Sequence, residues 1–148
     1  MRPSDVVFGY FDLADNTASA SEHAVRVEVV DIQPDGRRTC DVVMVAGAKQ
    51  WVQSIEQVVR EPPLLLTTRS WSWTADRQQP LLTILTHRRF TSESDGTRVD
   101  ATIDYQLDRP WRRPLWATTN WLRRGAARRE FERQLSLIAQ RIEAGQVT

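Results

Sequence analysis

The sequence predicts an α+β fold in which a curved antiparallel sheet wraps around one long C-terminal helix. Two observations carry this prediction. Six short segments in which apolar and polar residues alternate run from about residue 24 to residue 108, and one long, arginine-rich amphipathic segment follows, roughly over residues 111–143. Strands that come first in the chain and a helix that comes last are typical of a sheet with helices gathered on one face.

A short helix is expected before the sheet. Ser4 and Asp5 can cap a helix whose apolar residues extend to Phe11, although Gly9 weakens it. Residues 12–22 are mostly polar or small, so we expect them to form an irregular connection.

Six strands follow, and turn residues bound each of them. In the first, from residue 24, valines alternate with Arg26 and Glu28, which predicts one apolar and one polar face. The tripeptide Pro34-Asp35-Gly36 predicts a tight turn into the second strand. The remaining strands are expected over residues 38–46, 49–60, 64–73, 81–91 and 98–107.

The last strand and the closing helix have the clearest patterns. In the strand, the odd-numbered residues Val99, Ile103 and Tyr105 point to one face, which is predicted to be dry. The even-numbered residues are polar and point to the other face. Prolines bracket the entry to the helix, where a missing N–H is tolerated. A five-residue step in the apolar stripe between Ala126 and Phe131 predicts a bend.

Length and composition favour one cytoplasmic domain. A chain of 148 residues can bury a sizeable core. The single cysteine, Cys40, lies in an apolar strand segment and is expected to be a buried hydrophobe in a reducing compartment. No apolar run approaches the ~18 residues of a membrane span, and no signal-peptide core follows the first residues.

The charge is unevenly distributed. Residues 109–148 hold nine arginines and three glutamates, whereas the whole chain has a formal net charge of only +1. A basic helix can bind acidic partners, so an interaction module is one hypothesis. Because several of these arginines, such as Arg123 and Arg128, lie away from the apolar stripe, a solvated outer face is the simpler interpretation and nucleic-acid binding is not expected.

Several stretches carry a resemblance to a known family. They are residues 5–8 with Asp12, residues 23–29, Gln50-Trp51-Val52, and Phe90 followed by Asp95-Gly96-Thr97. Together with the order of elements, they resemble the START-like or SRPBCC superfamily. Its members include pollen-allergen-like proteins, lipid carriers and bacterial polyketide cyclase/dehydrases. The resemblance implies one START-like domain over residues 1–148, with a helix-grip fold.

The chain departs from the family pattern at two places. A strand normally precedes the opening helix, so the sheet is expected to have six strands, or seven if that strand exists, and a missing edge strand favours a homodimer. Aromatase/cyclases that the chain resembles have a pocket arginine a few residues after the Trp-Val pair, where this sequence has Ile55. This difference removes the polar group expected to hold a polyketide oxygen.

The expected cavity lies between the sheet and the C-terminal helix and takes a hydrophobic, partly oxygenated ligand. Arg88 lies at alternate positions with Ile84 and Phe90, so its side chain is expected to point inward with theirs. It would then anchor a ligand oxygen or pair with an internal acid, unless a bulge turns it to solvent. His87 would then face outward. The other candidate ligand-binding residues are the hydroxyl-bearing Tyr105, the indoles of Trp51, Trp71, Trp73 and Trp116, and the amide of Asn120.

No catalytic residue can be assigned from sequence. Motifs for metal sites, phosphate loops and nucleophile elbows are missing, and His23 and His87 are the only histidines, so neither a cofactor nor a metal is expected. Two functions remain for one cavity. The first is polyketide cyclase/dehydrase-like binding or catalysis, and the second is a non-enzymatic carrier or chaperone for a lipid or isoprenoid such as a quinone.

Overall fold

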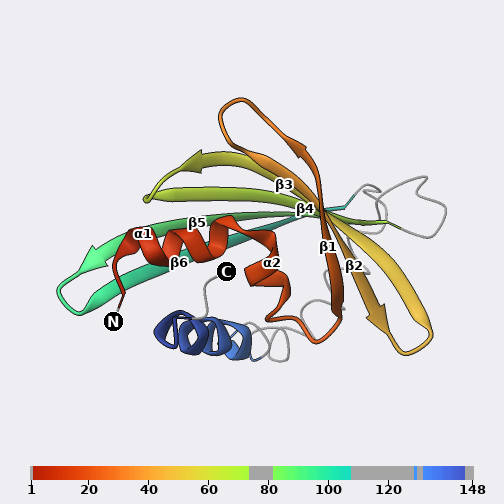
Figure 1. Cartoon of the computed structure of the whole chain (residues 1–148). Coiled ribbons are helices and arrows are strands. Elements are labelled where there is room, and N and C mark those ends of the chain that lie inside the picture. Colours follow the sequence, from red (N-terminus) through yellow and green to blue (C-terminus); the bar gives the residue numbers. More distant parts are fainter. Residues whose placement is uncertain (1, 74–81, 108–128, 130–131, 146–148) are drawn as a thin grey trace.

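The computed structural model describes residues 2–73, 82–107, 129 and 132–145 (Figure 1). Two short helices come first, α1 (Ser4–Asp12) and α2 (Ala14–Ala18). The strands are β1 (Ala24–Ile32), β2 (Arg38–Ala46), β3 (Lys49–Glu61), β4 (Leu65–Trp73), β5 (Leu82–Glu93) and β6 (Gly96–Leu107). A C-terminal helix follows, described over residues 132–143.

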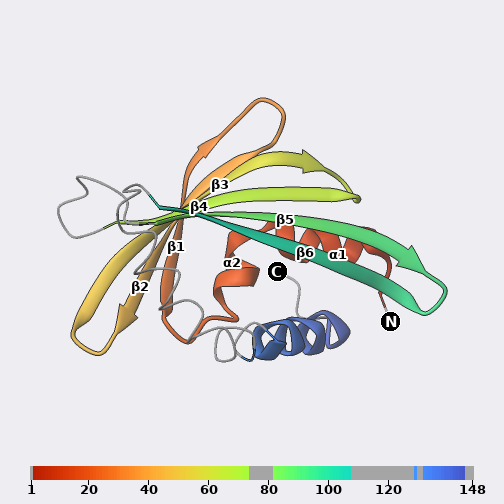
Figure 2. The same ribbon diagram turned by 180° about the vertical axis from the view of Figure 1, so that it is seen from behind.

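The strands form one antiparallel sheet in which each strand pairs with its neighbours in sequence. β1 and β2 cross β5 and β6 at a steep angle, as the right-handed twist of a sheet requires over six strands (Figures 1 and 2). The helices lie on one side of the sheet in both views. We call the face toward them the inner face and the opposite face the outer face.

The core lies where α1 and the C-terminal helix meet the half of the sheet that contains β4 to β6. Tyr10, Leu66 and Phe90 are its largest fully buried side chains. The Phe90 ring makes a T-shaped contact with Phe8, with centroids 5.3 Å apart, and lies 5.7 Å from the centroid of Phe11. Aromatic packing therefore fixes α1 to the sheet.

The predicted six-stranded sheet, short N-terminal helix and C-terminal helix are confirmed. Gly36 adopts a φ of 83°, as the turn prediction requires. Two local predictions are wrong. Residues 14–18 form α2 rather than an irregular connection, and the residue before α1 is Pro3, with no side-chain cap. The Ser4 hydroxyl instead accepts a hydrogen bond from Ser92 at 3.0 Å.

The prediction that β1 has an apolar face buried in the core is also wrong. Val25, Val29, Val30 and Ile32 are all more than half exposed. β1 is an edge strand, and register shifts on both sides of its centre disturb the alternation that a regular strand would keep. The valine pattern therefore reflects β-propensity at an edge and not burial.

We expect this exposed edge to pair with the same edge of a second copy. An antiparallel pairing centred on Val27 sets Arg26 of each copy opposite Glu28 of the other, and opposite charges on facing residues stabilise such pairs. Light scattering should therefore show a dimer. Arg26→Glu should shift the protein toward monomer, and the double swap Arg26→Glu/Glu28→Arg should restore the dimer.

Arg98 provides the control for this experiment, because it is an exposed arginine on the other edge strand, β6. Arg98→Glu should leave the oligomeric state unchanged. A wild-type protein that stays monomeric at every concentration tested would contradict the prediction.

Candidate functional site

A cavity of about 360 Å³ lies between the inner face of the sheet and the two N-terminal helices. Its size is at the low end of small-molecule pockets, roughly 300–1,000 Å³. The described walls come from β2 to β5, from the end of α1, from α2, from Ser21 and from Ala24 at the start of β1, and from Gln134 of the C-terminal helix. The sequence placed this cavity against the C-terminal helix, whereas α1 and α2 supply most of its described helical wall.

One wall of the cavity is apolar. Cys40, Val42 and Met44 alternate along β2, and all three side chains are buried. Ile55, which occupies the position expected for a pocket arginine, lies opposite Cys40 in the register and continues this wall. Burial raises the pKa of the Cys40 thiol, so the thiol stays protonated at neutral pH and contributes apolar surface.

A polar band crosses the middle of the inner face. It is formed by side chains at alternate positions of three neighbouring strands, namely Gln53 and Gln57 of β3, Thr68 and Ser70 of β4, and Thr86 and Arg88 of β5. Hydroxyl, amide and guanidinium groups can all donate hydrogen bonds. The cavity thus combines an apolar wall with a band of donors and acceptors, as a site for an apolar molecule with a few oxygens requires.

Arg88 lies in this cavity and has no acidic partner among the residues that the structure describes. Its Nη1 donates a hydrogen bond to Thr68 Oγ1 at 3.1 Å, and its guanidinium carbon lies 5.5 Å from the centroid of the Phe11 ring. Burial lowers the pKa of Arg88 to about 10, so the side chain remains charged at neutral pH. The regular pairing of β4 with β5 excludes the bulge that would turn Arg88 outward.

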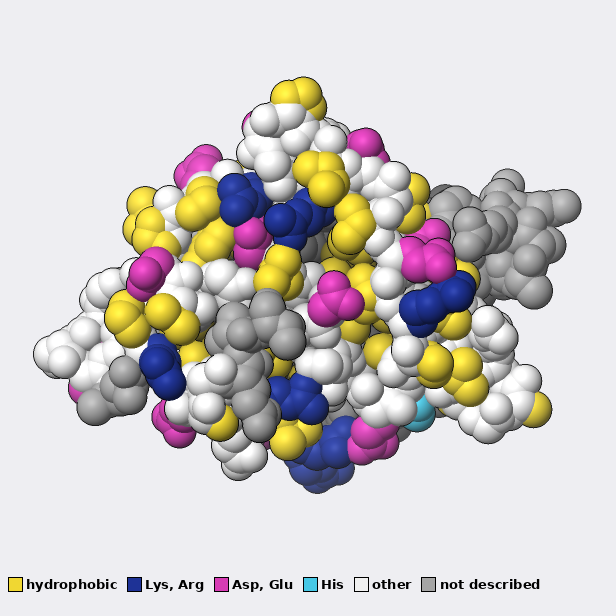
Figure 3. Space-filling model, viewed as in Figure 1, with side chains coloured by type: hydrophobic (Ala, Val, Ile, Leu, Met, Phe, Trp, Pro, Cys, Tyr) yellow, Lys and Arg dark blue, Asp and Glu magenta, His cyan; other side chains and the backbone are white. Residues whose placement is uncertain are grey.

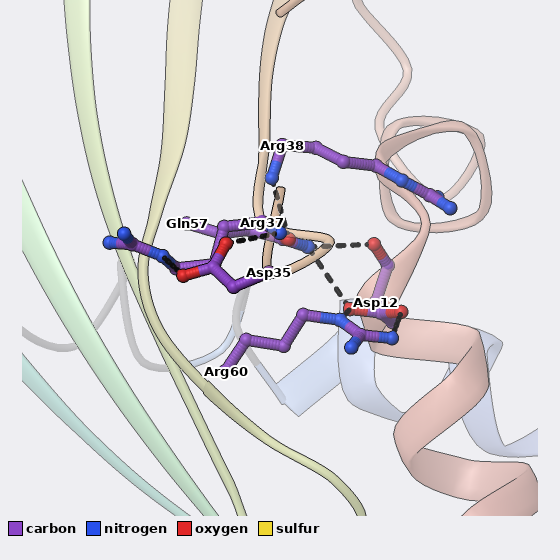
Figure 4. Close-up of polar contacts among 6 residues, drawn as sticks. All are labelled: Asp12, Asp35, Arg37, Arg38, Gln57 and Arg60. Carbon is purple, nitrogen blue, oxygen red and sulfur yellow. Dashed lines mark hydrogen bonds and ion pairs between the residues drawn. The ribbon is translucent and has the colours of Figure 1, made fainter. Parts of the chain in front are cut away.

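The acidic group nearest this band is already engaged. Figure 4 shows Asp12, at the end of α1, facing Arg60 and Gln57 of β3. Arg60 donates to both carboxylate oxygens at 2.8 and 2.7 Å, and Gln57 Nε2 donates to the Asp12 carbonyl at 2.8 Å. The hydrogen bond with Asp12 raises the pKa of Arg60. This network joins α1 to the sheet and neutralises Asp12.

The structure distributes the other predicted site residues over different places. Trp51 lies on the inner face opposite Met44, and its ring centroid is 6.2 Å from that of His23, but it does not line the cavity. Trp71 pairs with Ser54 on the outer face, and the backbone of Trp73 pairs with Val52. Trp116 and Asn120 are outside the described residues.

Tyr105 lies on the inner face by its register with Ile84, but its side chain is 42% exposed. Ala101 on the same face is also exposed. The prediction of a uniformly dry face on β6 is therefore wrong, because this strand is the second edge of the sheet. His87 lies on the outer face, as expected, and its Nδ1 is 3.0 Å from Thr67 Oγ1.

Sequence reasoning missed most of the polar band. Alternate residues of a strand point to the same face, so Gln53 and Gln57 share a face with Trp51 and Ile55. This rule would have placed the two glutamines of β3 on the inner face. The same rule would have placed Thr68 and Ser70 beside Arg88. Polar residues on the inward-facing side of the strands were the available signal, but Arg88 was the only predicted ligand-binding residue that belongs to this band.

The apolar space continues beyond Arg88. A second cavity of about 330 Å³ lies between α1, the β5–β6 turn and the C-terminal helix, lined by side chains such as Val7, Leu135 and Ile142. A small space of about 140 Å³, to which both Phe11 and Arg88 contribute, lies between the two. Arg88 therefore stands at the boundary between the polar band and the most apolar part of the interior.

The described part of the basic helix makes contacts within the chain. Arg133 forms an ion pair with Glu22, and Arg141 donates a hydrogen bond to the Ser19 hydroxyl. On the face shown in Figure 3, Arg and Lys side chains alternate with Asp and Glu and do not form one basic patch. The hypothesis of an interaction module remains a prediction, since Arg123 and Arg128 are outside the described residues.

Two further observations concern the described part of the chain. It contains no group of three or more His, Cys, Asp or Glu side chains placed to hold a metal ion. None of its helices has the length and apolar character needed to cross a bilayer.

Solved structures match this chain over most of its length, and two of them illustrate the similarity. The crystal structure of TTHA0849 from Thermus thermophilus matches with a TM-score of 0.59 and 20% sequence identity, over 97% of this chain and 92% of that chain. The crystal structure of Ara h 8.0201, a Bet v 1-like allergen, matches with a TM-score of 0.62 and 12% identity, over 94% and 91%. The chain has a helix-grip fold. No protein-family model matches it, and no curated protein matches it significantly.

Proposed function

We propose that the protein binds a small, hydrophobic and partly oxygenated molecule in the inner cavity. The observation that carries this proposal is the pairing of an apolar wall on β2 with a polar band around Arg88, inside a space of about 360 Å³. Apolar atoms gain free energy by leaving water, and the polar band can satisfy ligand oxygens that would otherwise lose hydrogen bonds.

Two chemical outcomes of binding are consistent with this cavity. A polyketide cyclase/dehydrase-like protein would hold a reactive chain so that two of its own atoms meet, and the polar band would orient the carbonyl oxygens. The described cavity offers few groups for acid–base chemistry, because Asp12 is paired with Arg60 and burial keeps the Cys40 thiol protonated. Positioning would therefore be the main contribution of these residues.

A carrier of a lipid or isoprenoid is the second candidate. The observation that favours it is Ile55, an apolar residue that lines the cavity where the polyketide cyclases that the chain resembles place an arginine. An apolar group at this position suits the body of a ligand that is stored or transferred unchanged.

Native and denaturing mass spectrometry of protein purified from its own host should find a bound small molecule. A fluorescent, uncharged probe, N-phenylnaphthylamine, should also bind to the emptied protein. Thr86→Phe, which fills the cavity, should abolish probe binding, whereas Thr91→Phe, at an exposed position of the same strand, should not.

The identity of the molecule separates the candidates. An oxygenated aromatic or polyketide would support the cyclase/dehydrase-like function, and a quinone or lipid would support a carrier. A protein that carries no molecule and binds no probe would overturn the proposal of an internal binding site.

A further inference from the structure

The described lining of the cavity carries a positive charge that no described acidic side chain compensates. Among its described lining residues, Asp12 is the single carboxylate, and its two oxygens are held by Arg60. Arg88 and Arg38 line the same space, and no ion pair within the described chain involves either of them. The described walls of the cavity are therefore electropositive.

Arg88 also has unused hydrogen-bonding capacity. A guanidinium has five N–H donors in a planar fork, and the structure assigns one hydrogen bond to them, from Nη1 to Thr68 Oγ1. The Phe11 ring lies near the guanidinium carbon and stabilises its positive charge. This contact does not use the N–H groups, which point outward in the plane of the guanidinium. Several N–H donors of Arg88 therefore have no acceptor among the described residues and can bind a ligand.

Arg88 is partly buried, and a positive charge that has lost part of its contact with water is unfavourable unless an anion or several hydrogen bonds compensate for it. A neutral carbonyl would accept a hydrogen bond but would leave the charge in place. A carboxylate would accept two parallel hydrogen bonds from the guanidinium fork and would neutralise it, which is the geometry that arginine favours.

We propose that the natural ligand is a small amphipathic carboxylic acid, whose carboxylate pairs with Arg88. This inference rests on the proposed binding function and narrows it to one ligand class. The apolar body of the acid would lie on the wall formed by Cys40, Val42 and Met44, because that wall and Arg88 bound the same cavity. The volume of about 360 Å³ in this cavity, on the same side of Arg88 as that wall, favours a compact body, such as a fused ring system, over a long acyl chain.

The test compares two probes of the same shape that differ in charge. Naphthoate and methyl naphthyl ketone are titrated against the emptied wild-type protein by calorimetry, with displacement of N-phenylnaphthylamine as a second readout. We expect naphthoate to bind roughly ten- to a hundredfold more tightly, since hydrogen bonds to a charged group contribute about 1.5–3 kcal/mol. This preference should weaken only moderately as ionic strength rises, because Arg88 is only partly exposed and salt screens such a pair less than an exposed one.

Variants then assign the preference to Arg88. Arg88→Met keeps the length and apolar stem of the side chain and should remove the preference for naphthoate while ketone binding remains. Arg89→Leu is the matched control, since Arg89 is the next residue, exposed and on the outer face, and it should change neither affinity. Should Arg88→Met fail to fold, Arg88→Lys keeps the charge without the planar fork and should reduce the preference.

The outcomes separate this inference from the function on which it rests. Equal affinity of wild-type protein for naphthoate and the ketone would overturn the carboxylate assignment and leave an internal binding site in place. A preference that survives Arg88→Met would also overturn it. Failure of the wild-type protein to bind either probe or N-phenylnaphthylamine would count against the binding function itself.

Discussion

Replacing Phe90 with alanine should lower the free energy of unfolding by about 3–5 kcal/mol. Phe90 is 1% exposed, and its ring contacts Phe8 and Phe11 of α1 from the inner face of β5. The substitution would leave a cavity at the point where helix and sheet are joined, and the surrounding aromatic rings cannot collapse fully into it. Urea denaturation followed by circular dichroism measures the change.

Ile32→Ala is the control for Phe90→Ala. Ile32 is also apolar, but it is 61% exposed on the edge strand β1. We expect its truncation to have a much smaller effect, because little apolar surface is lost from the interior. Comparable losses for the two variants would show that the core is not located around Phe90.

Replacing Asp12 with alanine should lower the free energy of unfolding by about 3 kcal/mol. The substitution removes the carboxylate that accepts two hydrogen bonds from Arg60 and faces Gln57, and the exposed fraction of the Asp12 side chain is only 10%. Arg60 would then keep a partly buried charge without its partner. The change is measured by denaturation, as for Phe90.

Two controls test whether the loss arises from this ion pair. Asp35→Ala removes an ion pair of the same type, with Arg37, but at an exposed turn where water screens the charges, so a much smaller loss is expected. In a double-mutant cycle, adding Arg60→Met to Asp12→Ala should recover part of the lost stability. Strictly additive losses would show that the two residues stabilise the fold independently.

The strands could be predicted because their signals are local. Alternation with a period of two residues located all six strands, and turn residues such as Gly36 located the connections between them. The irregular connection expected over residues 12–22 was wrong in part, because the helix α2 in this segment is too short to show a full amphipathic period. Its formation depends on contacts with α1 and β1 rather than on its own sequence.

The site could be predicted only in part, for a related reason. Parity along β5 assigned Arg88 and His87 to opposite faces, because regular pairing preserves alternation. Alternation along a strand could not show that Asp12 forms an ion pair with Arg60, which is 48 residues away in the chain. Because Asp12 is the single carboxylate among the described lining residues of the cavity, this pairing leaves no unpaired carboxylate in that lining.

The sequence by itself determined which residues share a face, since that depends on the two-residue repeat of a strand and the turns between strands. Tertiary structure alone decided which of those faces are covered. Val25, Val29 and Val30 of β1 are more than half exposed and the glutamines of β3 face the cavity, although hydrophobicity predicts the reverse. The physical reason is that burial depends on where the helices pack, and the surroundings of a charge such as that of Arg88 depend on segments that are distant in the chain.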